Sequence, residues 1–187
     1  MMLVDPKSII KRLTQPCKAA LEAGVVQCVN ARHYEVTLEH VMLALLDNAD
    51  SDIAFLVTNY DLDPARLRQV LQRSLEDLRT GNAGKPTFSP TMLEWMQDAF
   101  TVGMMDYGFQ KVRSGVLFAR LVQLPSKYSM SNIGSYLESI PKDDLKTNLP
   151  KILSGSKEHA EASAVAASGA GRMRGMRGMR VLLLGAG

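Results

Sequence analysis

The chain has 187 residues, of which 46% are hydrophobic and 6% aromatic, and its formal net charge is +3. This length suffices for one compact domain or two packed half-size units, and the scarcity of β-branched and aromatic runs favours helix over sheet. The positive charge comes from arginines after Ser168, because the rest of the chain has 18 basic and 19 acidic residues. That balance speaks against binding to nucleic acid or an anionic membrane.

Helix starts are well marked. Asp5-Pro6, Asp63-Pro64 and Ser89-Pro90 each place a capping side chain before a proline at the first helical position. Between these starts, apolar residues recur at helical spacing. The helices expected in the first half cover residues 6–13, 17–28, 38–46, 53–57 and 67–78.

Residues 79–86 contain two glycines and a proline, which predicts a linker. Helical spacing returns after it in residues 93–104, 116–122, 133–137 and 145–152. The two cysteines, Cys17 and Cys28, stand about three helical turns apart on one predicted helix, which excludes a disulfide between them. Reduced cysteines, and a polar interruption at residues 5–7 where a signal peptide would be apolar, lead us to expect a cytoplasmic protein.

The second half of the chain repeats the first. Residues 36–46 align with 112–122, and a long, a buried, a short and a proline-led amphipathic helix follow in the same order each time. Two such units bury each other's open faces. We therefore predict an all-α fold, a pseudo-twofold double four-helix repeat with an extra N-terminal helix.

The predicted domain covers residues 1–153, with repeats at about 14–78 and 89–153. Ser, Ala and Gly dominate residues 154–168, which we expect to be a linker. Residues 169–187 are of low complexity, and we expect a disordered or non-native tail there.

Sequence motifs for catalysis are missing. The three histidines are scattered, and no second histidine follows His40 to complete a zinc-protease helix. Gly81-Asn-Ala-Gly84-Lys85 lacks the first glycine and the Ser/Thr of a phosphate loop. Two cysteines and three histidines at these spacings do not predict a closed zinc site. We expect no catalytic, cofactor-binding or metal-binding residue in this chain.

A short first helix lying over the helix that follows it predicts a groove for an amphipathic guest helix, a common mode of peptide recognition. Small residues on the second helix keep such a groove open. The spacing alone favours the simpler interpretation, in which these side chains fill the core. The groove candidates are Ile9, Ile10, Leu13, Cys17, Ala20, Leu21 and Gly24.

Residues 33–46, His-Tyr-Glu-Val-Thr-Leu-Glu-His-Val-Met-Leu-Ala-Leu-Leu, resemble the signature Thr-x-Glu-His-Leu-Leu-x-x-Leu-Leu of the Clp N domain. The doubled four-helix plan is similar too. Gly81-Asn82, Pro86-Thr-Phe-Ser-Pro90, Trp95 and Val112-Arg-Ser-Gly115 further resemble ClpV, the type VI secretion branch of the Clp-type AAA+ ATPases. The resemblance covers about residues 5–153.

The resemblance implies a substrate-recognition domain without enzymatic activity of its own. In this family, ATP and Mg belong to the motor modules of the full-length hexamer. The N domain holds an N-terminal helix of the large sheath protein in an apolar groove at its first helices, which directs disassembly of the contracted sheath. The expected partners are that helix and the rest of the AAA+ hexamer, with neither nucleic acid nor membrane, and the isolated domain is expected to be a monomer.

Two other functions stay open from the sequence. The first is the N domain of a general Clp disaggregase or protease unfoldase that binds adaptors or unfolded chains. The second is a stand-alone nucleic-acid binder that uses the arginines of residues 172–180 as a basic arm.

Overall fold

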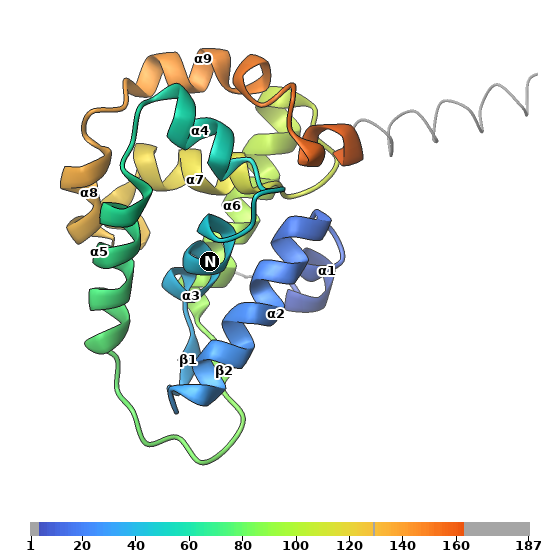
Figure 1. Cartoon of the computed structure of the whole chain (residues 1–187). Helices are drawn as coiled ribbons and strands as arrows, with labels where there is room; N and C mark the ends of the chain where they lie inside the picture. The colour runs from blue at the N-terminus through green and yellow to red at the C-terminus, as the bar shows by residue number, and fades with distance from the viewer. Residues whose placement is uncertain (1–3, 129, 163–187) are drawn as a thin grey trace, which may run out of the picture.

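The computed structural model describes residues 4–128 and 130–162 as a helical bundle with one minimal sheet (Figure 1). The helices are α1 (Pro6–Ile10), α2 (Gln15–Asn30), α3 (Leu38–Leu46), α4 (Ile53–Asn59), α5 (Pro64–Glu76), α6 (Pro90–Tyr107), α7 (Ser114–Gln123), the 3-10 helix η1 (Pro125–Tyr128), α8 (Ser131–Leu137) and α9 (Lys142–Ile152). Residues 157–162 are also helical. The strands β1 (Glu35–Val36) and β2 (Thr87–Phe88) pair in parallel. Within the described residues, no helix has both the length and the apolar character of a membrane span.

The proline-marked helix starts form as predicted. The side chains of Asp5, Asp63 and Ser89 each accept a hydrogen bond from a backbone N–H of the first turn that follows. These caps satisfy donors that a helix leaves unpaired at its start. At the start of α3, Thr37 and His40 form a reciprocal capping box, in which the His40 ring takes the place of the more usual Glu.

The chain folds into the predicted all-α double repeat, with α2–α5 in the first repeat and α6–α9 in the second. Two short parallel pairings cross between the repeats. The segment before α6 pairs with the segment before α3, Phe88 with Val36. The segment before α2 pairs with the segment before α7, Leu13 with Val112. The repeats are therefore tied together at two equivalent points, as a pseudo-twofold relation requires.

The helix α7 runs through the middle of the molecule and lies between α6, α4 and α9 (Figure 1). Its side chains are buried on nearly every side. Trp95 of α6, itself fully buried, donates its indole N–H to the Leu117 carbonyl over 2.8 Å. Burying a large apolar side chain stabilises the folded state by about 1.5–3 kcal/mol. Because most of its residues are buried, α7 is the centre of the second repeat, as α3 is of the first.

Two boundaries differ from the sequence-based prediction. The first helix ends at Ile10 rather than Leu13, because Leu13 pairs with Val112 instead. The predicted linker of residues 154–168 is packed on the domain as far as it is described. Ser156 and Glu158 are buried, and the Ser156 hydroxyl accepts a hydrogen bond from the N–H of residue 159 at the start of the last helical turns. The predicted tail of residues 169–187 lies outside the described residues.

Gly115 lies in the first turn of α7, where a side chain has no room. A Cβ there would overlap Leu153 Cδ1 and lie 3.0 Å from Asp52 Oδ2, whereas a Cβ at Gly103 of α6 would lie 3.7 Å from its nearest neighbour. We expect Gly115→Ala to lower the free energy of unfolding by about 1–3 kcal/mol through overpacking. The control Gly103→Ala should leave it unchanged or raise it by up to about 1 kcal/mol through helix propensity. Urea denaturation followed by circular dichroism measures both, and equal stability of the two variants would contradict this packing.

Candidate binding surface at the amino-terminal helix

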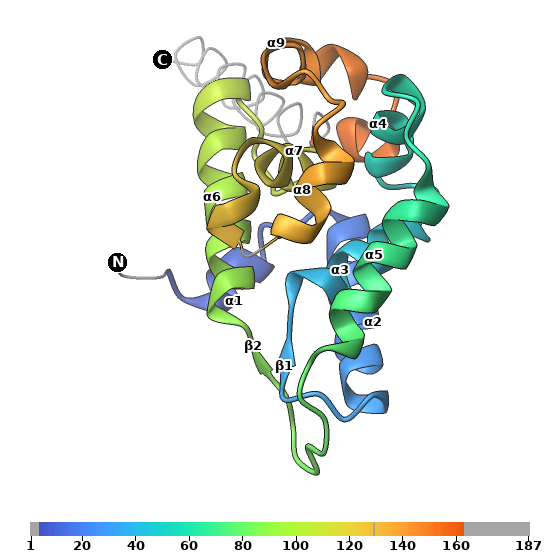
Figure 2. The ribbon, with the colours of Figure 1, turned by 90° about the vertical axis from the view of Figure 1, so that its left-hand side faces the viewer.

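The short helix α1 is held against α6. Asp5 caps it, Ile9 is buried beneath it, and the Val4 N–H donates to Gln97 Oε1 on α6 over 3.0 Å. Figure 2 shows α1 lying across the lower half of α6. The main packing partner of α1 is thus α6 rather than α2.

The groove predicted between the first helix and α2 is not accompanied by close packing of these two helices. The small residues of α2 face α3 instead, and α2 packs chiefly against α3. A Cβ at Gly24 would lie 3.3 Å from His40 Cβ and 3.6 Å from the Val41 nitrogen. Gly24 thus permits a close approach of two helices, where the sequence had indicated space for a guest.

Most of the seven groove candidates lie in the core. Six are buried, and the seventh, Ile10, is half-buried on α1. The buried ones are Ile9, Leu13, Cys17, Ala20, Leu21 and Gly24. A partner that approaches the folded domain meets only Ile10 of this set. Binding of a peptide by these residues stays a prediction.

A different set of side chains lies on and next to α1 and on the face of α6 that carries Gln97 and Phe100. Arg12 stacks on the half-buried Phe100 ring, with its Cζ 4.9 Å from the ring centroid. Met104 follows Phe100 by one turn of α6 and is 40% exposed, and Val4 is 46% exposed. We name Val4, Ile10, Arg12, Phe100 and Met104 the α1 surface. In the sequence, this surface is indicated by the apolar stripe of α6. The earlier members of the stripe, Leu93 and Met96, are buried in the core, whereas Phe100 and Met104 extend beyond it.

Next to the start of α2, a buried carboxylate holds the helix of residues 157–162 in place. Glu158 Oε1 accepts hydrogen bonds from Thr14 Oγ1 (2.6 Å) and the Ser114 N–H (2.9 Å). Its Oε2 accepts from the Asp52 N–H (2.6 Å) and from the Ser114 hydroxyl. Glu158 thus satisfies donors at the starts of α2, α4 and α7, where helix dipoles favour negative charge.

Burial raises the pKa of Glu158, and the nearby Asp52 carboxylate raises it further. The hydrogen bonds from Ser114 and Thr14 favour the charged form and oppose that rise in pKa. Cys17, one of the groove candidates, directs its thiol at Glu158 Oε1 over 3.5 Å. Its role in the folded domain is therefore to pack beside this carboxylate.

A fully buried ion pair between Arg113 and Asp52 lies beside Glu158. Arg113 grips Asp52 with two nitrogens, Nε to Oδ2 at 2.7 Å and Nη2 to Oδ1 at 2.9 Å. The Ser156 hydroxyl bridges the two side chains, and the Phe109 ring lies 4.6 Å from the Arg113 Cζ atom. Removing one partner of such a pair leaves an uncompensated buried charge. We call Glu158, Asp52, Arg113 and Ser156 the lock, because they join the starts of α2, α4 and α7.

In the described part of the chain, the side chains with metal-ligating spacing are Cys28, His33 and His40. They lie at the end of α2 that is remote from Thr14 and Cys17. The sequence-based expectation of no metal site concerned spacing along the chain, and it did not anticipate this convergence.

The chain matches a known domain family. The profile of the Clp repeat (R) N-terminal domain matches residues 12–121. The AAA+ ATPase ClpV1 of Pseudomonas aeruginosa is 24% identical over 153 residues, which are 81% of this chain. The chain spans only 17% of the length of that relative.

Solved structures share the fold. The N-domain of ClpV from Vibrio cholerae gives a TM-score of 0.78 at 28% identity, covering 84% of this chain and 95% of that one. A complex of a ClpV N-domain with a VipB peptide gives a TM-score of 0.77 at 28% identity, covering 84% and 97%. The N-terminal domain of ClpV1 from an enteroaggregative E. coli gives 0.72 at 24% identity, covering 82% and 93%, and this likeness concerns the fold alone.

Replacement of Glu158 tests the lock. In Glu158→Gln, an NH₂ group replaces an oxygen that accepts from a backbone N–H, so one buried donor loses its partner. We expect the free energy of unfolding to fall by about 1–3 kcal/mol. The control Glu138→Gln, at an exposed position, should change it by less than about 0.5 kcal/mol. Chemical denaturation measures both, and an unchanged Glu158→Gln variant would show that residues 157–162 are not locked to the domain.

Proposed function

This chain belongs to the Clp repeat N-terminal domain family, and we propose that it is the substrate-recognition domain of a type VI secretion AAA+ ATPase. In this proposal, the domain binds an N-terminal helix of the large sheath protein and so directs disassembly of the contracted sheath. Hydrolysis of ATP is the task of the AAA+ modules in the longer protein.

The observation that carries the proposal is the likeness to the ClpV N-domain that was solved with a VipB peptide. That likeness extends over 84% of this chain and 97% of the solved one. The independent match to a ClpV1 over 153 residues supports the same branch of the family. A general Clp disaggregase would share the fold. The ClpV N-domain structures, one of which holds a VipB peptide, favour a partner from the secretion machine instead.

The geometry favours the outer side of α1 as the place where the sheath helix binds. The candidates on α2 are committed to the core, whereas Ile10, Phe100 and Met104 present apolar surface beside a short helix. An amphipathic helix binds by laying its apolar face on such a surface. Arg12 at its edge is placed to contact a polar or acidic side chain on the guest.

We expect a fluorescein-labelled sheath-protein helix to bind the full chain saturably in anisotropy titrations, and a scrambled peptide not to bind. Met104→Glu should weaken binding at least about ten-fold, equivalent to about 1.4 kcal/mol, because it places a charge against the apolar face of the guest. The control is Val29→Glu on α2, where Val29 is 51% exposed and lies outside the α1 surface. It should bind like the unaltered chain.

The possible outcomes test sheath recognition and the position of the binding surface separately. Absence of saturable binding up to high micromolar peptide would contradict sheath recognition. Normal binding that Met104→Glu leaves unchanged would contradict the α1 surface only. Casein that competes as well as the sheath helix would favour a general unfoldase.

A further inference from the structure

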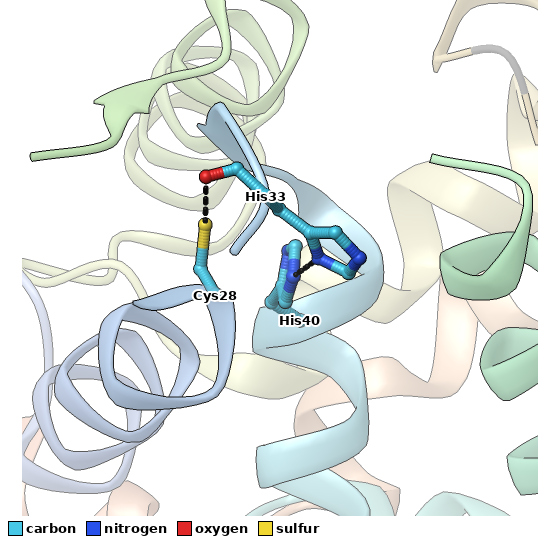
Figure 3. A group of neighbouring side chains, drawn as sticks. All are labelled: Cys28, His33 and His40. Atoms are coloured by element: carbon cyan, nitrogen blue, oxygen red, sulfur yellow. Dashed lines mark hydrogen bonds between the residues drawn. The ribbon is translucent and has the colours of Figure 1, made fainter. Parts of the chain in front are cut away.

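Three consecutive segments bring a thiol and two imidazoles together. Cys28 lies near the end of α2, His33 in the turn that follows, and His40 in the first turn of α3. The Cys28 sulfur and one nitrogen from each ring lie within 4.8 Å of one another, and all three residues are buried (Figure 3). His33 Nδ1 and His40 Nε2 are 3.0 Å apart.

This set of donors suits zinc. Zn²⁺ takes thiolate sulfur at about 2.3 Å and imidazole nitrogen at about 2.0–2.1 Å in tetrahedral sites. Tetrahedral geometry with these bond lengths sets neighbouring ligand atoms about 3.3–3.6 Å apart. The two ring nitrogens therefore need to separate by only a few tenths of an ångström, and the sulfur needs to move inward by about 1 Å.

The site also has a route from solvent. His33 lines two surface cavities of about 430 Å³ and 450 Å³. One is bounded by Thr37 and Thr87, and the other by Gln27 and Gln72. A metal ion can enter by either side, and a water molecule can supply the fourth ligand that three protein side chains leave open.

The hydrogen bonds define the protonation state without metal. The Thr37 backbone N–H donates to His40 Nδ1 over 3.0 Å, so that nitrogen carries no proton. In the neutral ring, Nε2–H then donates to His33 Nδ1. Burial and, to a lesser extent, the neighbouring His33 lower the pKa of His40 to about 4, so the His40 ring meets a metal ion in the neutral form that binds metals.

We propose that Cys28, His33 and His40 bind one zinc ion, with water as the fourth ligand. Binding requires the thiol proton of Cys28 to pass to solvent and the His40 proton to move from Nε2 to Nδ1. Thr37 Oγ1, 3.0 Å away, then accepts a hydrogen bond from the new Nδ1–H. His33 binds through Nδ1 and keeps the proton on Nε2, so one proton is released for each ion bound.

The ion would clamp the end of α2 to the start of α3. Its cost is two hydrogen bonds, from the Cys28 thiol to the His33 carbonyl over 3.7 Å and from the Thr37 N–H to His40 Nδ1, a loss that is small beside the binding of zinc by thiolate and imidazole. The proposal does not depend on sheath recognition, because the α1 surface lies at other helices.

Cobalt(II) provides the direct test, because a thiolate–cobalt bond absorbs in the near ultraviolet. We expect the purified full chain, stripped with a chelator, to bind one Co²⁺ with this absorption band. Excess Zn²⁺ should abolish the band, and a pH indicator should register one released proton per ion. Zn²⁺ should also raise the Tm. A missing band at excess Co²⁺, or a band without any rise of the Tm by Zn²⁺, would overturn the proposal.

Matched variants locate the site. Cys28→Ala should lose the band, whereas Cys17→Ala, which removes the other buried free thiol, should keep it. His33→Asn retains a hydrogen-bond acceptor beside His40 and so keeps the fold, and it should weaken Co²⁺ binding more than about ten-fold. Should Cys28→Ala fail to fold, His33→Asn decides alone. Unaltered binding by a folded Cys28→Ala or His33→Asn would contradict the assignment.

Discussion

The carboxylate of Glu158 accepts hydrogen bonds at the starts of three helices that come from distant parts of the chain. This arrangement follows from the burial of α7. A helix buried from its first residue must satisfy its first N–H groups with protein atoms. Glu158 and Asp52 supply acceptors, and Arg113 forms an ion pair with the Asp52 carboxylate. Residues 157–162 are consequently part of the domain, and the position of α2 is fixed relative to both repeats.

This constraint explains where a partner can bind. With α2 held at its start by the lock and packed on α3, its groove candidates Cys17, Ala20, Leu21 and Gly24 are buried in the interior. The short helix α1 stays outside this packing and rests on α6, where apolar side chains remain exposed. The double repeat thus packs α2 against α3 and leaves α1 on the outer side of α6. In the sheath-recognition proposal, this division separates the part that holds the fold from the part that contacts the partner.

Local signals in the sequence predicted the local features. Asp63-Pro64 contains both the capping side chain and the proline that favour a helix start. The helical spacing of residues 36–46 and 112–122 indicated the repeat. Features that depend on distant partners were not predictable. Gly24 on a helix face suits a guest or a neighbouring helix equally well, and only the fold shows that α3 fills the space. Glu158 reads as a linker residue because its partner Thr14 lies 144 positions away. Likewise, Cys28 and His40 converge only through the turn that joins their helices.

In the sheath-recognition proposal, the outer side of α1 and the adjoining part of α6 bind the sheath helix. Hydrogen–deuterium exchange of the full chain, with and without saturating sheath-protein helix, tests it most directly. We expect the peptide to slow exchange in residues 4–12 and in residues 97–104 of α6, and to leave exchange in residues 22–30 of α2 unchanged. Slower exchange confined to residues 22–30 of α2, with residues 4–12 and 97–104 unaffected, would contradict it.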